Sequence, residues 1–313
     1  MSGKGKSVLA AAVLAAALAA AAFFLLNPAR ERLPECLENV DESDRTPAVI
    51  TYLFRPGQRI SFDLEVARAS NDTAAPAGAI LQAKASLVLD VLSADGPGAN
   101  LEGGFTHVTL ESAGGYGRRR VEIAPSGVRV FDADRQTEPA PEDIEVHKLL
   151  TGRFNITVSP RGEVRSPRLV EAQGLQPDWL QQLAGAFFLV FPPDPIVPGD
   201  AWENMLPVPG ANGGEARLEN KFLGYKSVEG ERCAAISFNM IYEGPLLDAG
   251  RETAQRRVNG RTELTGGMLF SFDRRLPVEI VKQCHTRLTD EHGQTLAQIQ
   301  ENGRVRLVGV RAK

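Results

Sequence analysis

From Ala48 onward the chain consists of short segments in which apolar and polar side chains alternate, and Gly, Pro, Asn and Asp separate these segments. In Arg59–Val66, for example, every second residue from Ile60 onward is apolar. Because successive side chains of a strand point to opposite faces, this period of two predicts half-buried β-strands. The fold is therefore predicted to be mainly β. Further strands are predicted at 85–92, 105–110, 120–123, 127–131, 216–225, 232–242, 262–272, 277–288, 295–300 and 304–310, with a hairpin at 154–164.

One segment has helical periodicity instead. Pro177 suits the first turn of a helix, Asp178 places a negative charge near its start, and apolar pairs recur as far as Phe188. This short helix divides the strands into two groups. The predicted domains after residue 47 are a first β unit at 48–175, a connecting helix and Pro-rich crossing at 176–198, and a second β unit at 199–313. Solvated loops are predicted at 70–78 and 133–143.

The two β units show similar short sequences in the same order. Phe54–Gln58 opens the first unit as Val197–Trp202 opens the second. Two further pairs follow in order: Ser86–Val91 with Lys221–Tyr225, and Thr151–Ile156 with Thr265–Phe272. These matches predict an internal duplication. Two similar antiparallel units would then pack as a pair of curved sheets or as one open barrel or clam.

The amino terminus carries an unbroken apolar run over residues 8–26. About 20 helical residues span the hydrocarbon core of a bilayer, so this run is long enough for one transmembrane helix. Lys4 and Lys6 precede the run, and a short basic head favours an amino terminus on the cytoplasmic side. The sequence therefore predicts a single-pass protein of the bacterial cytoplasmic membrane, with its carboxyl-terminal body in the periplasm.

The predicted domains before the body are a signal anchor at 1–28 and an acidic, flexible tether at 29–47. The alternative is a signal peptide that is cleaved at a small-residue site around Ala20 and Ala22. Cleavage there would leave Phe23–Leu26 at the new amino terminus, which is why an uncleaved anchor is preferred. In the alternative case the body would be secreted.

Several of these motifs together resemble a family of exported, β-rich bacterial envelope proteins. They are the Pro56-Gly57-Gln58 strand entry, the Ser159–Val164 hairpin, the short apolar helix, and the Pro198–Trp202 strand entry. The similarity covers residues 48–310. It implies a β-rich fold and export. The family has no assigned function, so the resemblance implies no catalytic residue.

Charge and cysteine content restrict the partners. The formal net charge is −4, whereas nucleic-acid binding needs a basic excess, so no nucleic-acid partner is predicted. Cys36, Cys233 and Cys284 are too few for a disulfide scaffold and are not spaced as a metal site. Cys233 and Cys284 lie in strand-like segments of the same unit. If the compartment is oxidising, they are the natural disulfide pair.

No catalytic motif is recognisable in the sequence. A nucleophile elbow is absent, and the four histidines do not form a metal-binding frame. No catalytic residue, metal or cofactor is predicted, and the chain is interpreted as non-enzymatic. The distant alternative is a hydrolase with dispersed carboxylates, for which Asp178, Asp194, Asp200 and Glu203 surround the inter-unit segment.

Five aromatic residues around the connecting helix form a candidate apolar pocket: Trp179, Phe187, Phe188, Phe191 and Trp202. They would either anchor the junction between the units or line a site for a lipid or another apolar ligand. The alternative function is a structural protein that binds other envelope proteins. An apolar cavity of roughly 300 Å³ or more would favour the ligand, whereas a filled core with exposed strand edges would favour the structural role.

Overall fold

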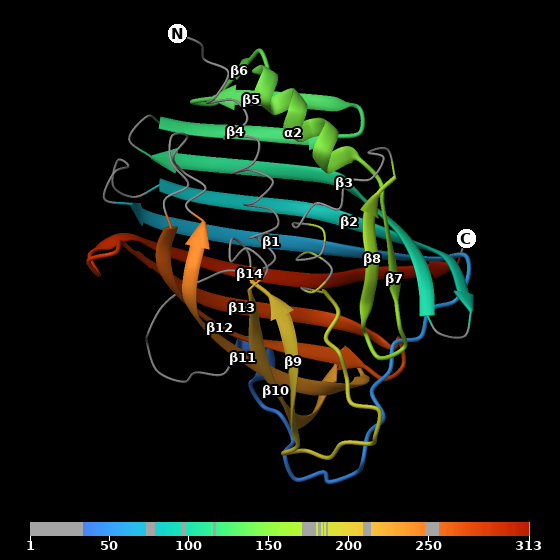
Figure 1. Ribbon diagram of the computed structural model, residues 1–313. Helices are drawn as coiled ribbons and strands as arrows, with labels where there is room; N and C mark the ends of the chain where they lie inside the picture. Colours follow the sequence, from blue (N-terminus) through green and yellow to red (C-terminus); the bar gives the residue numbers. More distant parts are fainter. Residues whose placement is uncertain are drawn as a thin grey trace.

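The computed structural model describes residues 34–72, 79–95, 98–114, 117–170, 180, 183, 185, 187–208, 214–247 and 257–312. The strands form a single curved antiparallel sheet (Figure 1). The predicted membrane anchor lies outside the described residues. No helix within them is long and apolar enough to cross a membrane.

The 14 strands of the sheet fall into two meanders and one hairpin. The first meander is β1 (Gln58–Asp72), β2 (Ala79–Asp95), β3 (Gly98–Gly114), β4 (Gly117–Ala124), β5 (Gly127–Asp132) and β6 (Arg135–Thr137). The second is β9 (Ala201–Pro207), β10 (Glu215–Val228), β11 (Glu231–Leu247), β12 (Arg257–Ser271), β13 (Leu276–Thr289) and β14 (Thr295–Ala312). The hairpin is β7 (Phe154–Val158) and β8 (Val164–Leu169).

The first strand of the first meander, β1, pairs with the last strand of the second meander, β14. β1 lies antiparallel to β14 from Gln58 opposite Ala312 to Asp72 opposite Ala297. The order across the sheet is β6-β5-β4-β3-β2-β1-β14-β13-β12-β11-β10-β9. The mainly β, antiparallel fold is confirmed, but the two predicted units share one continuous sheet.

β14 is one strand where two were predicted, at 295–300 and 304–310. Glu301, Asn302 and Gly303 break the apolar alternation, which suggested a turn. Pairing on both sides keeps this stretch extended, because Asn302 lies opposite Ala67 of β1 and Gln283 of β13. Tertiary pairing thus overrides the local sequence signal.

The predicted hairpin at 154–164 is formed by β7 and β8, and it leaves the main path of the sheet. β3 pairs with β4 through Val108–Gly114, whereas its other end, Ala99–Gly103, pairs with β7. β7 and β8 consequently run across the direction of the strands in the main path of the sheet (Figure 1), while β7 stays antiparallel to the Ala99–Gly103 end of β3. Through this change of partner, Phe154 and Ile156 reach the core.

A helix that the sequence analysis missed, α2 (Pro141–Thr151), packs on β3, β4 and β5. Residues 133–143 were predicted to be a solvated loop, yet they contain β6 and the first turn of α2. Pro141 occupies the first turn, and Asp143 accepts a hydrogen bond from the Ala140 N–H at 2.8 Å. Val146 and Leu150 are the apolar residues that α2 buries.

The two faces of the sheet differ in the number of residues buried on them and in the segments that cover them. We call the face that carries the main core the inner face and the opposite one the outer face. Alternate residues of the long strands point to the inner face and are buried there, among them Phe62, Leu64, Leu87, Phe105, Leu110, Phe238, Leu264, Met268 and Ile280. A separate small cluster lies on the outer face: Cys36, Leu37, Cys233, Ala235 and Leu269.

Residues 34–47, which we call the strap, pack against the sheet from the beginning of the described chain. A short 3-10 turn, η1 (Glu35–Leu37), places Cys36 and Leu37 in the outer cluster, where both are buried. The segment was predicted to be a flexible tether because its acidic residues are conspicuous. Most of those side chains are exposed, and two apolar residues between them attach the strap.

Two glycines of the sheet make room for the strap. A Cβ atom at Gly267 would lie 2.5 Å from the Leu37 side chain. A Cβ atom at Gly224 would lie 2.3 Å from the carbonyl oxygen of Asp41. Because atoms cannot approach so closely, a side chain at either position would displace the strap.

Hydrogen bonds fix the strap along its length. Lys226 Nζ donates to the carbonyl oxygens of Cys36 at 2.9 Å and Glu38 at 2.7 Å. Asp41 and Tyr225 exchange two backbone hydrogen bonds, of 2.8 and 3.1 Å. The strap is therefore held both by shape and by polar contacts.

Candidate functional site

Four of the five aromatic residues in the predicted pocket lie in the described chain, and Trp179 lies outside it. Phe187, Phe188 and Phe191 are all buried in the main core. Trp202 is half-buried on β9, with its ring centroid 6.1 Å from that of Phe191. The structure thus brings Phe191 and Trp202 together.

The connecting helix packs on the inner face. Leu180, Leu183 and Phe187 are helical, and together with Phe188 they form what we call the plug. The plug lies against β1, β2 and β7, and the rings of Phe187 and Phe62 are 5.2 Å apart. Its other contacts across this gap are Leu87, Leu89, Phe154 and Ile156.

The space between the plug and the sheet is almost completely filled. The hollow that remains there measures about 10 Å³. That is about the minimum that one water molecule needs, and far below the 300–1,000 Å³ of typical ligand sites. In this state the pocket is occupied by the protein's own side chains.

The described side chains of the plug make apolar contacts. Within the described residues, no hydrogen bond or ion pair joins its four side chains to the sheet. The situation changes at the next residue, Leu189, whose N–H donates to the Tyr52 hydroxyl at 3.1 Å. Phe191 exchanges two hydrogen bonds of 2.8 Å with Arg161, one of them from the guanidinium. Trp202 Nε1 donates to the Val190 carbonyl oxygen at 2.8 Å.

Residues 189–191 therefore form a polar-bonded hinge directly after the plug. Tyr52 is central to it, because it is buried and its ring also packs on those of Phe188 and Phe270. Burial raises the pKa of the Tyr52 hydroxyl well above its usual range. Sequence reasoning overlooked Tyr52, although Ala48, Ile50, Tyr52 and Phe54 alternate with polar or exposed residues and are all buried.

The disulfide expected between Cys233 and Cys284 is not formed in the structure, where both are free thiols. Cys284 belongs to the inner core, whereas Cys233 belongs to the outer cluster with Cys36. Side chains on opposite faces of one sheet cannot be bridged without moving the backbone. Burial raises the pKa of Cys36 to about 12 and that of Cys233 to about 11, so both thiols are unreactive.

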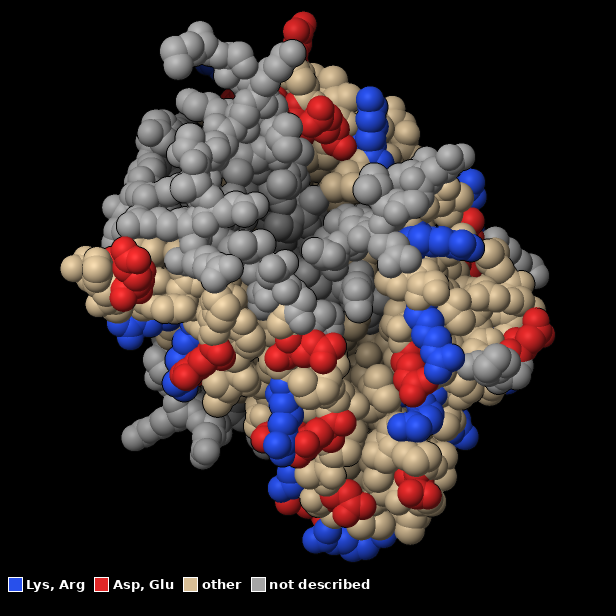
Figure 2. Space-filling view, viewed as in Figure 1, with Lys and Arg blue, Asp and Glu red and all other residues tan. Residues whose placement is uncertain are grey.

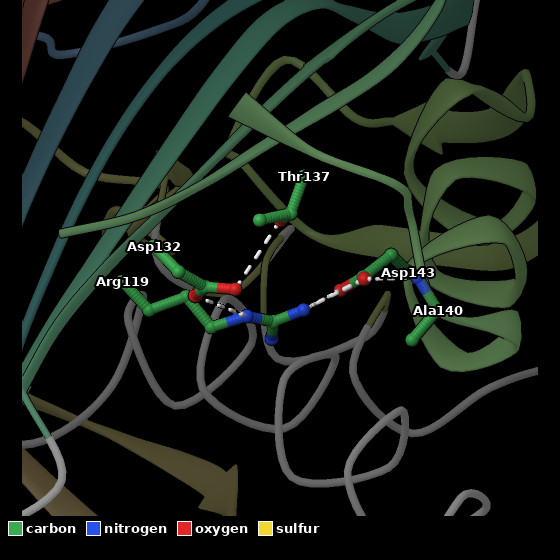
Figure 3. A network of polar contacts seen from close by, with 5 residues as sticks. All are labelled: Arg119, Asp132, Thr137, Ala140 and Asp143. Atoms are coloured by element: carbon green, nitrogen blue, oxygen red, sulfur yellow. Dashed lines mark hydrogen bonds and ion pairs between the residues drawn. The ribbon is translucent and has the colours of Figure 1, made fainter. Parts of the chain in front are cut away.

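A polar network at the edge of the inner face holds α2 in place (Figure 3). Arg119 Nη2 lies 2.7 and 2.9 Å from the two carboxylate oxygens of Asp143, which is buried. Arg119 Nε lies 3.6 Å from Asp132, and Asp132 accepts a hydrogen bond of 3.2 Å from Thr137. Every group in this network has a partner, and together they attach α2 to the sheet.

One cation lies close to the hinge on the inner face. Lys282 of β13 borders a hollow of about 10 Å³ with Leu189, Leu264 and Ile280. Burial of its ammonium group lowers the pKa of Lys282 to about 7.

The carboxylates of the distant hydrolase alternative do not gather. Asp200 accepts the Val197 N–H at 2.8 Å in a turn, Glu203 pairs with Arg217, and Asp194 is exposed. Asp178 lies outside the described residues. Across the described part of the chain, no group of three or more metal-binding side chains occurs.

The surface charges are interspersed. Figure 2 shows Lys and Arg beside Asp and Glu over the second meander, without an expanse of one sign on the face in view. Several of these charges are paired, as Arg217 is with Glu203 and Arg261 with Glu243. This pattern is unlike the basic stripe of a nucleic-acid interface.

No family model matches the chain, and no curated protein matches it in sequence. The structure is similar to that of lipovitellin, described for its lipid–protein interactions, with a TM-score of 0.50 and 10% identity. The match covers 83% of this chain and 26% of the lipovitellin chain, so this chain spans about a quarter of that protein. At this identity the similarity shows a shared fold alone.

Two other solved structures match with lower scores. DynF, from the dynemicin biosynthesis pathway of Micromonospora chersina, has a TM-score of 0.22 at 11% identity, over 92% of this chain and 95% of its own. A Bacteroides fragilis protein described as exported, with a YmcC-like fold, has a TM-score of 0.23 at 9% identity, over 84% and 100%. Similarity this slight says nothing further about this chain.

Proposed function

We propose that this chain is a non-enzymatic protein of the bacterial cell envelope that binds a lipid or another apolar ligand on its inner face. The ligand would occupy the place of the plug, which would move away about the hinge at residues 189–191. The observation that carries this proposal is the contrast at Leu189. Before it the described contacts are apolar, and after it every residue to Phe191 has a polar bond.

Apolar contacts alone make the plug exchangeable for an acyl chain. Displacing it breaks no described hydrogen bond, and an acyl chain of similar cross-section would restore the apolar burial on Leu87 and Leu89. The cost of displacement is then offset by the ligand's own burial, at about 25 cal/mol per Å². A plug bound through buried polar groups would not be exchangeable in this way.

The fold and the amino terminus support the same proposal. Lipovitellin, which shares the fold, is described for its lipid–protein interactions. The apolar run at 8–26 would anchor the body beside a source of lipid, on the periplasmic side of the cytoplasmic membrane. Cleavage of this run would instead give a secreted carrier.

We also infer that the two meanders are copies of one unit. Each is a run of six antiparallel strands, and Pro56-Gly57-Gln58 leads into β1 as Pro198-Gly199-Asp200 leads into β9. The second pair of similar segments falls on β2 and β10, which are also equivalent. The third pair falls on β7 and β12, which are not equivalent, so the hairpin β7–β8 would be an addition to the first copy.

The proposal is tested by photo-crosslinking the full chain in polyoxyethylene-detergent micelles with palmitate that carries a diazirine group. Labelled peptides should come from β2 and β7, which the plug covers. Phe187→Ala should increase the label on these peptides because the plug loses its largest contact with β1. Phe222→Ala is the matched control, since Phe222 is equally buried but lies on β10, away from the plug.

Label that appears only on residues 8–26, or label that Phe187→Ala and Phe222→Ala raise equally, would overturn the proposal. The alternative would then be a structural protein that binds other envelope proteins. The observation that favours it is the filled interior together with β9, which ends the strand order and carries the exposed Met205.

A further inference from the structure

A large hollow bordered by described residues lies on the outer face, away from the plug. It is an open groove of about 500 Å³ over β2, β1, β14 and β13, and Pro34 and Glu35 of the strap form part of its border. This volume is within the range of ligand sites. The groove is independent of the inner face and of the function proposed for it.

Strand register places two rows of polar side chains in this groove. In the first row, Gln82 lies opposite Ala67, Ala67 opposite Asn302, and Asn302 opposite Gln283. Three amides thus cross four strands on one face, with only the methyl group of Ala67 between them. All three amide residues are exposed. In the described part of the chain their side chains make no hydrogen bond to other residues.

The second row is charged but balanced. Lys84 lies opposite Glu65 with an ion pair of 3.1 Å, and Glu65 lies opposite Arg304. Arg304 is paired with Glu279 at 2.8 Å and lies 3.6 Å from Glu35 of the strap. Lys84 and Arg304 each have an acidic partner, so the charges of this row are balanced within the row.

These features select the chemistry of a ligand. The three amides on the floor would lose their hydration without replacement under a purely apolar chain. A neutral ligand with many groups that both donate and accept hydrogen bonds would pair with these amides, because an amide group also donates and accepts. Hydroxyl groups have this property.

We propose that the outer groove is a binding site for a neutral saccharide chain, with Gln82, Asn302 and Gln283 as its hydrogen-bonding floor. Lys84 and Arg304 flank the chain and bond its hydroxyl pairs from the sides. The groove is open and its floor is nearly flat, so the affinity is low, with a Kd on the order of 1 mM.

The test is calorimetric titration of the full chain, in polyoxyethylene-detergent micelles that contain no sugar, with two hexasaccharides. One is a hexamer of glucose and the other a hexamer of N-acetylglucosamine. At least one should bind, and Asn302→Ala and Gln283→Ala should each weaken its binding about tenfold through the loss of hydrogen bonds. Both residues are exposed, so these variants should keep the wild-type melting temperature.

Asn239→Ala is the matched control. Asn239 is exposed on the same face and lies in the continuation of the same row, opposite Thr265, which is itself opposite Gln283. It does not line the groove, so its removal should leave saccharide binding unchanged. Failure of both sugars to bind, or equal losses in the Asn239 and Asn302 variants, would overturn the proposal. Binding of glycerophosphoethanolamine in the absence of sugar binding would also overturn it and would assign the groove to a lipid headgroup.

Discussion

The strap and the plug are two short segments that pack on opposite faces of the same sheet, and they are held in different ways. The strap inserts Leu37 where Gly267 leaves room, and Lys226 donates to two of its carbonyl groups. The plug consists of four apolar residues, and within the described residues only apolar contacts hold its side chains. Polar bonds with fixed directions specify one position, whereas apolar contacts can be exchanged for others of similar size.

This difference separates a structural attachment from a replaceable one. The strap fixes residues 34–47 to the sheet. The plug fills a place that an apolar ligand of similar shape would also fill. The following experiments challenge this distinction, beginning with the largest expected effect.

Truncation of the plug should have the largest effect. Phe187→Ala should lower the free energy of unfolding by about 3–5 kcal/mol, because a buried aromatic ring leaves a cavity against Phe62. Palmitate should then restore part of the melting temperature by filling that cavity, because a ligand that binds only the folded state stabilises it. Differential scanning fluorimetry measures both effects. Phe222→Ala should lose similar stability without being rescued, and equal rescue of the two variants would refute an exchangeable plug.

Truncation of the strap should lower the free energy of unfolding somewhat less than truncation of the plug does, and it should expose different groups. Leu37→Ala should lower the free energy of unfolding by about 3 kcal/mol. It should also speed the labelling of Cys36 and Cys233 by a maleimide, while Cys284 on the other face stays protected. Mass spectrometry of labelled peptides separates the three thiols. Leu183→Ala, the same substitution in the plug, should leave Cys36 and Cys233 protected. If it exposes them equally, the two faces do not act independently.

The sequence predicted the strands well because their signal is local. Alternation in Arg59–Val66 requires only that one face be buried, and the sheet buries that face. The pairing of β1 with β14 is not local. More than 200 residues of chain separate the two strands, and neither has a sequence feature that identifies the other as its partner. Two separate sheets would satisfy the same alternation.

The strap and α2 could not be recognised from composition for a related reason. Both are polar segments attached by a few residues, and the composition of the exposed side chains dominated the interpretation. For α2 the useful signal was Pro141 followed by Asp143, which together mark a helix start. For the strap there was no equivalent signal, because the space that receives Leu37 is made by Gly267, far away in the sequence. The plug was predicted through its helical periodicity, but its hinge depends on Tyr52, which is equally remote.

Alkaline pH should loosen the strap before the plug. Burial raises the pKa of the Cys36 thiol in the folded protein from its ordinary value of 9.0 to about 12. Its contribution to stability is therefore fully present below pH 9 and is lost as the pH rises towards 12, since the thiol ionises first in the unfolded chain. At about pH 11 this loss should be about 2.7 kcal/mol. Denaturant titrations of the wild type and Cys36→Ala, compared between about pH 8 and pH 11, isolate the effect. If the two proteins lose the same amount of stability between these pH values, groups outside the strap cause the alkaline sensitivity.

The smallest expected effect concerns the hinge, and it links the two kinds of attachment. Trp202→Phe removes the hydrogen bond from Nε1 to the Val190 carbonyl oxygen while keeping an aromatic ring beside Phe191. The free energy of unfolding should fall by only about 1 kcal/mol, the usual net value of one hydrogen bond. Crosslinking of diazirine palmitate to β2 should nevertheless increase, because the plug can leave the inner face more easily when its hinge is less firmly bound. Tyr242→Phe is the control, since it removes one hydroxyl hydrogen bond, to the Pro245 carbonyl oxygen, at a site remote from the hinge. If crosslinking responds equally to both variants, general destabilisation admits the ligand and the hinge has no specific role.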